Sequence, residues 1–596
     1  MKYFTVCFLV MVFLSSGIAA APPLRANYFL PWDIDSSFAP ALAKYDLLVL
    51  DMELQHKNPA LLQTLRALNP DIIIYAYMTC EEINTGAGGN PEYLLRYNLF
   101  NGIADEWWLR DADGEHIVFW PGTWMLNVSS QCPLVGGKQW NSYFADFICQ
   151  NVLSTGLWDG FYIDNCWYEC SWLDDELDID NNGVADDPDW ADAQWRLGMQ
   201  TMMTAMRVQQ PGALLMGNGG YAYPEYLNGV LIETFPHWGG WPWLMQQYFA
   251  MTGSAVPPRY SVINCNTRNS GDGTDYQEMR FGLTSALLGD GFYSYDFGDT
   301  NHSQVWWYDE FDVDLGEAMK PAVCLNDSRE IYEDFETGST DWEMNNWDGM
   351  STQITTDAIS GTYSLEADTL ASTEEWNEFL YTPLYFSLPA NAGIRVVFDY
   401  KVTARQANCQ FYTLARSVAG GIPADCGFRW FGDEAVLGQV YTQDHVFTAH
   451  DFNDYYLIWG TTNQGVVVLD NLAVYSDENL LYERAFTQGR VLCNPSTHTQ
   501  VINLPHTYRC VAGSQDPVHN HGGLVDTVVL SPQDGIVLVK DLLAFYDLND
   551  DGVVDSQDLG SLLSHVGSVY PAADFNEDGL VDLADARELI GYITSG

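Results

Sequence analysis

Two acidic residues that end apolar segments are the first candidates for chemistry in this chain. Residues 160–164 are apolar up to Asp164, and residues 230–233 are apolar up to Glu233. Glycoside hydrolysis needs two carboxyl groups beside the scissile bond, one to attack or activate water and one to protonate the leaving oxygen. Burial at a strand end raises a carboxyl pKa and suits a proton donor. The alternatives are that Asp164 caps the next segment or binds a metal, and that Glu233 forms an interior ion pair.

These two acids need a scaffold that brings strand ends together. Between residue 26 and about residue 325, short apolar runs alternate with helical segments, as in parallel βα units. The expected strands are residues 26–30, 47–51, 72–78, 160–164, 214–217, 230–233, 260–264 and 291–295. Eight such units predict a (β/α)8 TIM barrel with its active site at the carboxyl ends of the strands. An extra strand at 124–128 would shift this numbering by one.

Further polar and aromatic residues lie at the same predicted strand ends. We expect them to bind sugar hydroxyls or stack on sugar rings, although each aromatic ring fits a core position equally well. Glu81 and Glu82 form a rival acid pair after the third strand. The candidate substrate-binding residues are Trp32, Asp33, Asp51, Glu53, Tyr77, Asn218, Trp238, Asn264 and Asp296.

Three acidic loops have the spacing of an EF-hand calcium loop. Such a loop places oxygen ligands at positions 1, 3, 5 and 12 and a glycine at position 6. Two near the C-terminus lie 27 residues apart, which an ordinary Asp/Gly-rich turn explains poorly. They predict two Ca²⁺ ions, and the loop at 178–189 predicts one in the barrel, with an acidic turn as its alternative. The predicted ligands are Asp547, Asn549, Asp551, Asp555 and Asp558; Asp574, Asn576, Asp578, Asp582 and Asp585; and Asp178, Asp180, Asn182, Asp186 and Asp189.

The C-terminal pair of loops resembles a type I dockerin, whose loops end in Asp as here at Asp558 and Asp585. The resemblance covers about residues 541–596 and implies a cohesin-bearing scaffold as partner. In that family, loop positions 10 and 11 face the cohesin. Here they are Ser556-Gln557 and Leu583-Ala584, so the two halves differ.

The stretch Asp159 to Asn165 looks like the fourth-strand motif of barrel glycosidases related to the α-galactosidase clan and to endo-α-1,4-polygalactosaminidase-like enzymes. Residues 28–32, 51–53 and 75–77 fit the first three strand ends of the same family. The resemblance implies that Asp164 is the nucleophile or base and that Glu233 is the general acid.

Beyond the barrel the composition changes to β-branched and aromatic alternation with Gly, Asn and Asp turns. Residues 332–338, 360–365 and 469–472 look like a jelly-roll carbohydrate-binding module, and residues 486–495 look like the β-domain that caps barrel glycosidases. We therefore predict a multidomain chain with an α-helical, EF-hand-like module at its end. Its parts are a signal peptide (1–20), barrel (22–326), inserted β-sandwich (327–479), small β cap (480–540) and dockerin (541–596).

Charge and cysteine content limit the classes of partner and the cellular compartment that fit this chain. Lys and Arg number 25 against 80 Asp and Glu, a net charge of −55, which excludes nucleic acid and anionic membranes as partners. Lys2, the apolar run 4–14 and small residues up to Ala20 predict a secretory signal, and no other run is long enough for membrane insertion. Cys409/Cys426 and Cys493/Cys510 are expected disulfides in a secreted protein.

Together these features predict a secreted, scaffold-attached glycoside hydrolase that acts on a polysaccharide or oligosaccharide, and the resemblance to the α-galactosidase clan implies α-linked ones among them. The main rival is a non-catalytic carbohydrate-binding or surface-assembly protein with a degenerate barrel. Replacing Asp164 with Asn separates the two, because it should abolish hydrolysis and spare glycan binding.

Overall fold

The computed structural model describes residues 23–595 except 238–239, 326–330, 384–385, 389–392, 407, 419–426, 433–434, 449–452, 476–479, 497, 550 and 577. The predicted signal peptide therefore lies outside the described residues. So do Trp238 and Cys426, and with Cys426 the predicted Cys409/Cys426 disulfide.

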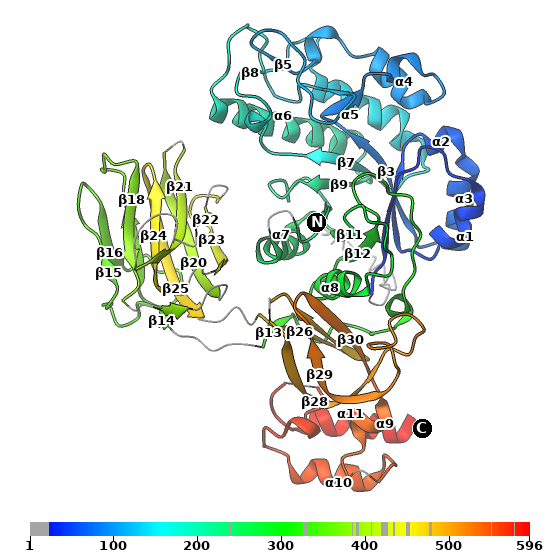
Figure 1. Ribbon diagram of the computed structural model, residues 1–596, viewed down its shortest axis with the longest axis vertical. Helices are drawn as coiled ribbons and strands as arrows, with labels where there is room; N and C mark the ends of the chain where they lie inside the picture. The colour runs from blue at the N-terminus through cyan, green and yellow to red at the C-terminus, as the bar shows by residue number, and fades with distance from the viewer. Residues whose placement is uncertain are drawn as a thin grey trace, which may run out of the picture.

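Eight parallel strands form the barrel, in the order of the chain (Figure 1). They are β1 Ala26–Phe29, β2 Leu47–Asp51, β3 Ile73–Thr79, β7 Gly160–Cys166, β9 Leu214–Gly219, β10 Gly229–Ile232, β11 Val262–Asn266 and β12 Phe292–Asp296. A parallel bridge between Arg25 and Tyr293 joins the first strand to the last. All eight predicted strands are confirmed, within a few residues at their ends.

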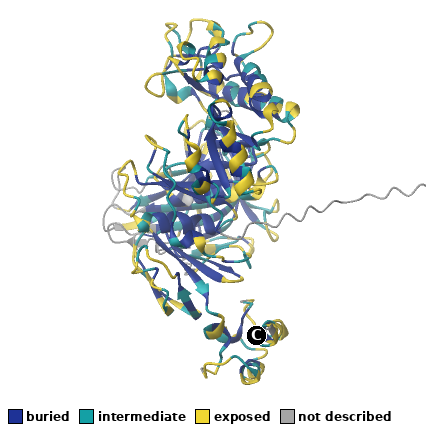
Figure 2. Cartoon of the chain, turned by 90° about the vertical axis from the view of Figure 1, so that its right-hand side faces the viewer, coloured by how far each residue is buried: buried dark blue, intermediate teal, exposed yellow. Residues whose placement is uncertain are grey.

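Apolar side chains fill the barrel and attach its helices. Tyr28, Val49, Tyr75, Tyr162 and Met216 are buried inside, as the layered packing of this fold requires. The outer helices are α1 Ala39–Leu42, α2 Leu54–Lys57, α3 Pro59–Leu68, α4 Leu94–Asn101, α5 Trp140–Asn151, α6 Pro188–Gln209, α7 Trp241–Ser254 and α8 Tyr276–Leu287. Figure 2 shows the buried strands wrapped by helices with exposed outer faces. Among the described residues, no helix has both the length and the apolarity to cross a membrane.

An elaborated loop between β3 and α5 forms part of the barrel mouth. β4 Glu82–Asn84 pairs there with β6 Thr123–Met125 in a separate two-stranded sheet. Of the strand expected at 124–128, only the first two residues belong to β6, and β6 does not join the barrel. The barrel numbering therefore does not shift. A second small sheet pairs β5 Arg110–Asp111 with β8 Leu177–Asp178.

A β-sandwich of two antiparallel sheets follows the barrel. One sheet has β14 Ile331–Glu333, β16 Ser351–Thr355, β17 Ser364–Asp368, β20 Gly393–Arg405, β23 Val440–Thr448 and β25 Gly465–Tyr475. The other has β15 Glu343–Met344, β18 Trp376–Tyr381, β19 Phe386–Leu388, β21 Gln410–Ser417, β22 Phe428–Phe431 and β24 Asn453–Thr462. Phe398, Phe411 and Trp459 are buried between them. Side chains alternate between core and surface along each strand, which explains the alternation in the sequence.

A third antiparallel sheet caps the barrel. It contains β13 Val323–Cys324, β26 Tyr482–Phe486, β27 Gly489–Asn494, β28 Gln500–Cys510, β29 Leu524–Leu530 and β30 Asp534–Lys540. The strand before the sandwich, β13, pairs with the strand after it, β26. Arg280 of α8 contacts Asp534 at 3.0 Å, a buried ion pair that ties this sheet to the barrel.

The predicted disulfide between Cys493 and Cys510 is wrong. Cys493 lies in β27 and Cys510 in β28, and β30 runs between these two strands. Two inter-strand steps separate the cysteines by about 10 Å, beyond the roughly 7 Å that a disulfide spans. Both are free, and the thiol of Cys493 contacts the Ser285 hydroxyl at 3.5 Å instead.

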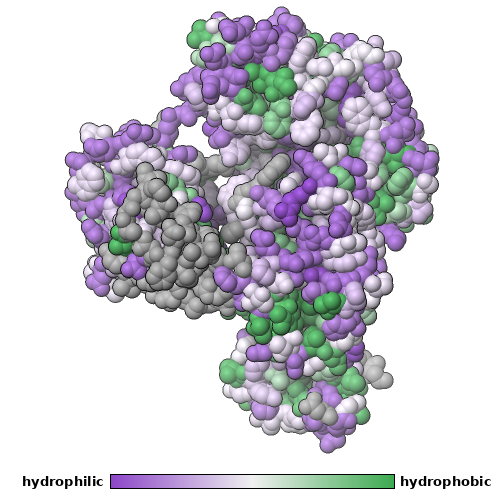
Figure 3. Space-filling view, in the orientation of Figure 1, coloured by the Kyte–Doolittle hydropathy of each residue, from purple (hydrophilic) through white to green (hydrophobic). Residues whose placement is uncertain are grey.

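The C-terminal module consists of α9 Leu542–Tyr546, α10 Ser556–Ser564, the 3-10 turn η8 Pro571–Ala573 and α11 Leu583–Ser595. Its Phe545 and Phe575 share one hydrophobic cluster with Tyr508 of the cap sheet. The His506 ring stacks 4.2 Å from Phe545. Figure 3 shows hydrophobic residues gathered over the cap above these helices, on a face that is otherwise mostly hydrophilic.

Candidate functional site

Asp164 and Glu233 meet at the carboxyl end of the barrel. Asp164 lies in β7, and Glu233 directly follows β10. Asn218, from the intervening strand β9, donates its Nδ2 to Asp164 Oδ1 at 3.0 Å and to Glu233 Oε2 at 2.7 Å. Because parallel strands present their carboxyl ends at one rim, two residues 69 positions apart in the sequence reach the same amide.

This shared contact limits the separation of the two carboxyl groups. Both oxygens touch one nitrogen, so Asp164 Oδ1 and Glu233 Oε2 lie at most about 6 Å apart.

Asp164 is held as a hydrogen-bond acceptor. The Tyr77 hydroxyl donates to Asp164 Oδ2 at 2.6 Å, and Asn218 donates to Oδ1. Burial and then the charge of Asp164 raise the pKa of Tyr77 well above its ordinary value, so this hydroxyl keeps its proton. The backbone amide of Asn165 also donates to Oδ1 at 3.0 Å, and the three donors together fix the direction of the carboxylate.

His302 approaches Glu233 from the segment after β12, and the sequence interpretation missed it. Its Nε2 lies 3.6 Å from Glu233 Oε1, and its Nδ1 forms a 2.9 Å hydrogen bond with Asp296 Oδ2. Asn264 donates to the same Asp296 oxygen at 3.2 Å. Asn264 and Asp296, both predicted to bind substrate, are thus buried and orient His302, whose ring lies 4.4 Å from that of Tyr28.

The electrostatics of the site favour a protonated Glu233. Burial, and then the negative charge of Asp164, raise the pKa of Glu233 to about 7, although His302 opposes the rise. Burial lowers the pKa of His302, but the hydrogen bond and charge of Asp296 outweigh it, and the net pKa is raised. The site therefore holds one carboxyl group that titrates near neutral pH beside one that accepts three hydrogen bonds.

Backbone strain also marks these strand ends. Asn165 (φ 52°) and Thr234 (φ 55°), the residues after Asp164 and Glu233, are both in the left-handed region. A positive φ is unusual for a β-branched residue such as Thr234 and costs on the order of 1–3 kcal/mol, a cost that recurs at functional sites. The strain turns the chain sharply after each carboxylate.

Glu81 and Glu82, the rival acid pair, differ in burial and in hydrogen-bond partners. Glu81 is fully buried and accepts the Trp167 amide at 3.2 Å, and burial raises its pKa well above the ordinary range. Glu82 accepts from Thr123 at 2.6 Å and from Asn165 at 3.3 Å. Glu82 therefore lies beside Asp164, and the charge of Asp164 also acts on the buried Glu81.

The predicted substrate-binding role of Asp51 and Glu53 must be corrected. Both are fully buried. Arg96 binds the Asp51 carboxylate with two hydrogen bonds of 2.6 and 2.7 Å, and Glu53 accepts the backbone amides of Leu95 and Arg96 at the start of α4. Because their carboxylate oxygens are bonded to other groups of the chain, Asp51 and Glu53 anchor the loop at the barrel mouth. In contrast, Trp32 and Asp33 are exposed at the rim.

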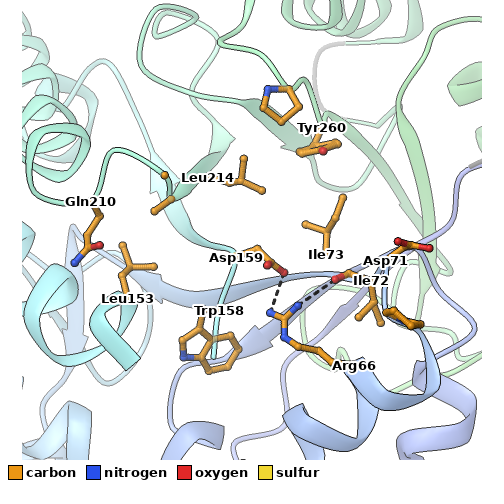
Figure 4. Close-up of a pocket in the computed structure, with 14 residues that line it drawn as sticks. Arg66, Asp71, Ile72, Ile73, Leu153, Trp158, Asp159, Gln210, Leu214 and Tyr260 are labelled. Atoms are coloured by element: carbon orange, nitrogen blue, oxygen red, sulfur yellow. Dashed lines mark hydrogen bonds and ion pairs between the residues drawn. The ribbon is translucent and has the colours of Figure 1, made fainter. Parts of the chain in front are cut away.

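A cavity of about 590 Å³ lies at the opposite end of the barrel (Figure 4). Arg66, Asp159 and Leu214 line it, near the amino ends of β3, β7 and β9. Arg66 is occupied by a 3.0 Å ion pair with Asp159. Because barrel enzymes place their chemistry at the carboxyl end, this cavity is separate from the candidate site.

The three acidic loops share one hydrogen-bonding pattern. In each, the first Asp accepts the amide of position 5 and, at 2.7–2.8 Å, that of the glycine at position 6: Asp178 from Gly183, Asp547 from Gly552 and Asp574 from Gly579. The glycines all have positive φ. The carboxylate and amide oxygens of these loops are hard ligands of the kind that Ca²⁺ prefers.

The loop in the barrel departs from the predicted ligand set at one position. Carboxylate oxygens of Asp178, Asp180 and Asp186 lie within 4.8 Å of one another. Asp186 accepts the Ile179 amide at 2.7 Å, where Asp558 and Asp585 make the matching contact in the C-terminal loops. Asp189 instead lies in the first turn of α6 and outside this group.

Residues 66–339 match the model of a hypothetical glycosyl hydrolase family, family 15 of that series. The matched segment contains Asp164, Asn218 and Glu233. It confirms the class predicted from the strand-end carboxylates: the protein is a glycoside hydrolase. Among curated proteins, none matches this chain.

Solved structures resemble separate parts of the chain. The glycoside hydrolase domain of PelA from Pseudomonas aeruginosa is 14% identical and covers 46% of this chain and 94% of its own, with a TM-score of 0.31. The CBM22-1 xylan-binding domain from Paenibacillus barcinonensis Xyn10C is 16% identical, covers 27% and 95%, and has a TM-score of 0.19. A family 22 carbohydrate binding module of Clostridium thermocellum Xyn10B is 14% identical, covers 26% and 96%, and has a TM-score of 0.20.

Proposed function

We propose that the barrel hydrolyses a polysaccharide or oligosaccharide with retention of anomeric configuration. Asp164 is the nucleophile and Glu233 the general acid and base. The observation that carries this proposal is the single amide of Asn218 that contacts both carboxyl groups. The short distance between these two oxygens supports a double-displacement mechanism.

In the first step, Asp164 Oδ attacks the anomeric carbon while the Glu233 proton moves to the leaving glycosidic oxygen. The bond from sugar to aglycone breaks, and a glycosyl ester of Asp164 forms. In the second step, Glu233, now a carboxylate, takes a proton from water, and the resulting attack releases Asp164 and the sugar. A pKa of about 7 lets Glu233 serve in both directions near neutral pH.

The net charge of −55 restricts the substrate. A polyanionic glycan would be repelled by the surface, whereas neutral or cationic glycans would not. We therefore place the substrate among neutral polysaccharides and amino-sugar polymers, including the α-linked galactose and galactosamine polymers that the sequence resemblance implies.

Release of reducing ends from α-linked galactose and galactosamine polymers tests this proposal. The wild-type protein should cleave at least one of them. Asp164→Asn and Glu233→Gln should each lower kcat by a thousandfold or more. Asp113→Asn, in an exposed turn, is the matched control and should keep full activity. A fully active Asp164→Asn protein would refute the nucleophile, and binding without cleavage by the wild type would favour a non-catalytic glycan-binding protein.

We further propose that the protein is secreted and that its C-terminal module is a dockerin. In this proposal Ca²⁺ is held by Asp547, Asn549, Asp551, Asp555 and Asp558 and by the five matching residues from Asp574 to Asp585. The surface around Leu583, which is 64% exposed, would face a cohesin. A third Ca²⁺ would be held by Asp178, Asp180 and Asp186 and would stiffen the loop after β7.

Pull-down with an immobilised cohesin tests the docking proposal. Binding should require Ca²⁺ and be lost in EDTA, because metal binding and folding of such loops are coupled. The Leu583→Ala variant should bind more weakly and remain folded. Binding that is unchanged in EDTA would contradict the calcium-dependent dockerin.

A further inference from the structure

A second, smaller pocket opens at the carboxyl end of the barrel. It has a volume of about 160 Å³ and lies between the loop after β1 and the segment from β4 to α4. Its lining residues are Trp32, Asn84, Gly86, Ala87, Asn90, Tyr93 and Arg96. That volume equals about five waters at liquid density, the size class of one sugar ring.

Two aromatic rings and a guanidinium build one wall of this pocket. The Tyr93 ring packs edge-on against Trp32, with 4.7 Å between ring centroids. The Arg96 guanidinium lies 4.2 Å from the Trp32 ring centroid and is fixed by its buried ion pair with Asp51. Trp32 is nevertheless 36% exposed. Its indole is therefore a rigid surface that still faces solvent, as stacking on a sugar requires.

Two amide side chains supply polar contacts. Asn84 Oδ1 accepts the Gly86 amide at 2.9 Å, and Asn90 Oδ1 accepts the Glu92 amide at 3.2 Å. These bonds fix each side chain with its oxygen toward the backbone. Neither Nδ2 has a partner among the described residues, so both can donate to hydroxyl groups in the pocket.

The pocket is connected to the candidate catalytic site through β4. Glu82 and Asn84 are two residues apart on that strand, so their side chains point to the same side and are about 7 Å apart along the strand. Glu82 accepts a 3.3 Å hydrogen bond from Asn165, the neighbour of Asp164. One sugar unit and its linkage cover a distance of this order.

We propose that this pocket is a sugar-binding subsite that holds one uncharged or cationic pyranose unit of the substrate, next to the unit that is cleaved. The sugar ring stacks on Trp32, and its hydroxyl groups accept hydrogen bonds from Asn84 and Asn90. The Arg96 charge is neutralised by Asp51, so it gives no preference for an acidic sugar. This inference rests on the proposed function of the same barrel.

Isothermal titration of the Glu233→Gln protein with α-linked galactose and galactosamine tetrasaccharides tests the subsite, because binding is then measured without cleavage. At least one tetrasaccharide should bind. Adding Trp32→Ala should weaken its Kd about tenfold, and adding Asn84→Ser together with Asn90→Ser should do the same, since Ser keeps an oxygen for the backbone amide, adds no charge and lacks the amide donor. Trp347→Ala, which removes an exposed ring from the sandwich, should change nothing.

Trp32→Ala could disturb Arg96, so each variant must keep the parent melting temperature, and the Asn pair tests the pocket without touching Arg96. Unchanged affinity in both variants, or no binding of either tetrasaccharide, would overturn the subsite. Unchanged affinity together with hydrolysis by the wild type would leave the two-carboxylate proposal standing. Trp32-dependent binding without hydrolysis would support the subsite and refute the catalytic proposal.

Discussion

Replacing Asp164 with Asn should lower the pKa of Glu233 as well as abolish turnover. The charge of Asp164 is the second cause of the raised pKa of Glu233, after burial. For two charges 5–6 Å apart, an effective dielectric constant of about 20 gives about 3 kcal/mol of repulsion. The Glu233 side chain is 14% exposed, so screening reduces this energy to about 1–3 kcal/mol. The pKa should fall from about 7, while burial keeps it above the ordinary glutamate value.

Carbon-13 NMR of labelled glutamate follows this titration directly, with Glu233→Gln identifying the signal. Asp113→Asn should leave the titration unchanged, because that residue lies in an exposed turn. A Glu233 pKa that stays at about 7 in Asp164→Asn would mean that the two carboxyl groups do not interact. The assignment of one site to both would then be refuted.

Three further changes have defined outcomes. In the wild type, kcat/KM should fall as pH rises through about 7, because Glu233 must carry a proton. His302→Gln should move this fall in kcat/KM to higher pH, since His302 lowers the pKa of Glu233. Arg96→Met should cost about 3–5 kcal/mol of unfolding free energy in urea, because it leaves the buried Asp51 unpaired. Removing Ca²⁺ with EDTA should lower the melting temperature of the C-terminal module and the cap together, because they share one hydrophobic cluster.

Each of these has a result that speaks against it. A pH profile unaffected by His302→Gln would place that residue outside the site. Arg110→Met is the matched control for Arg96, since it breaks an ion pair whose acid, Asp105, is 85% exposed; its cost should stay below about 1 kcal/mol. Similar losses in both variants would contradict the anchoring role of Arg96. An unchanged melting curve in EDTA would contradict metal binding by the loops.

The barrel strands were predictable because their residues are apolar on both faces. Strands such as 47–51 read as continuous hydrophobic runs bounded by polar turns, and their ends carry the acids. Topology alone then places Asp164 and Glu233 at one rim. The bridging role of Asn218 was not predictable, because it depends on the direction of a side chain on β9 that contacts acids from the two neighbouring strands.

Contacts between residues distant in the sequence account for the failures. Arg96 lies 45 residues from Asp51, so nothing near Asp51 indicated that it was already neutralised. His302 sits in an irregular segment with no periodicity, which returns to the barrel centre where its carbonyl accepts the Leu30 amide at 2.8 Å. Cys493 and Cys510 are close in sequence but separated by β30, an arrangement fixed only by the strand order of the cap.

The anomeric configuration of the first product tests the paired carboxylates most directly. Proton NMR during cleavage of a substrate polymer should show the product with the same configuration as the cleaved bond before mutarotation mixes the anomers. First formation of the opposite anomer would contradict direct attack by Asp164 and, with it, the double-displacement mechanism.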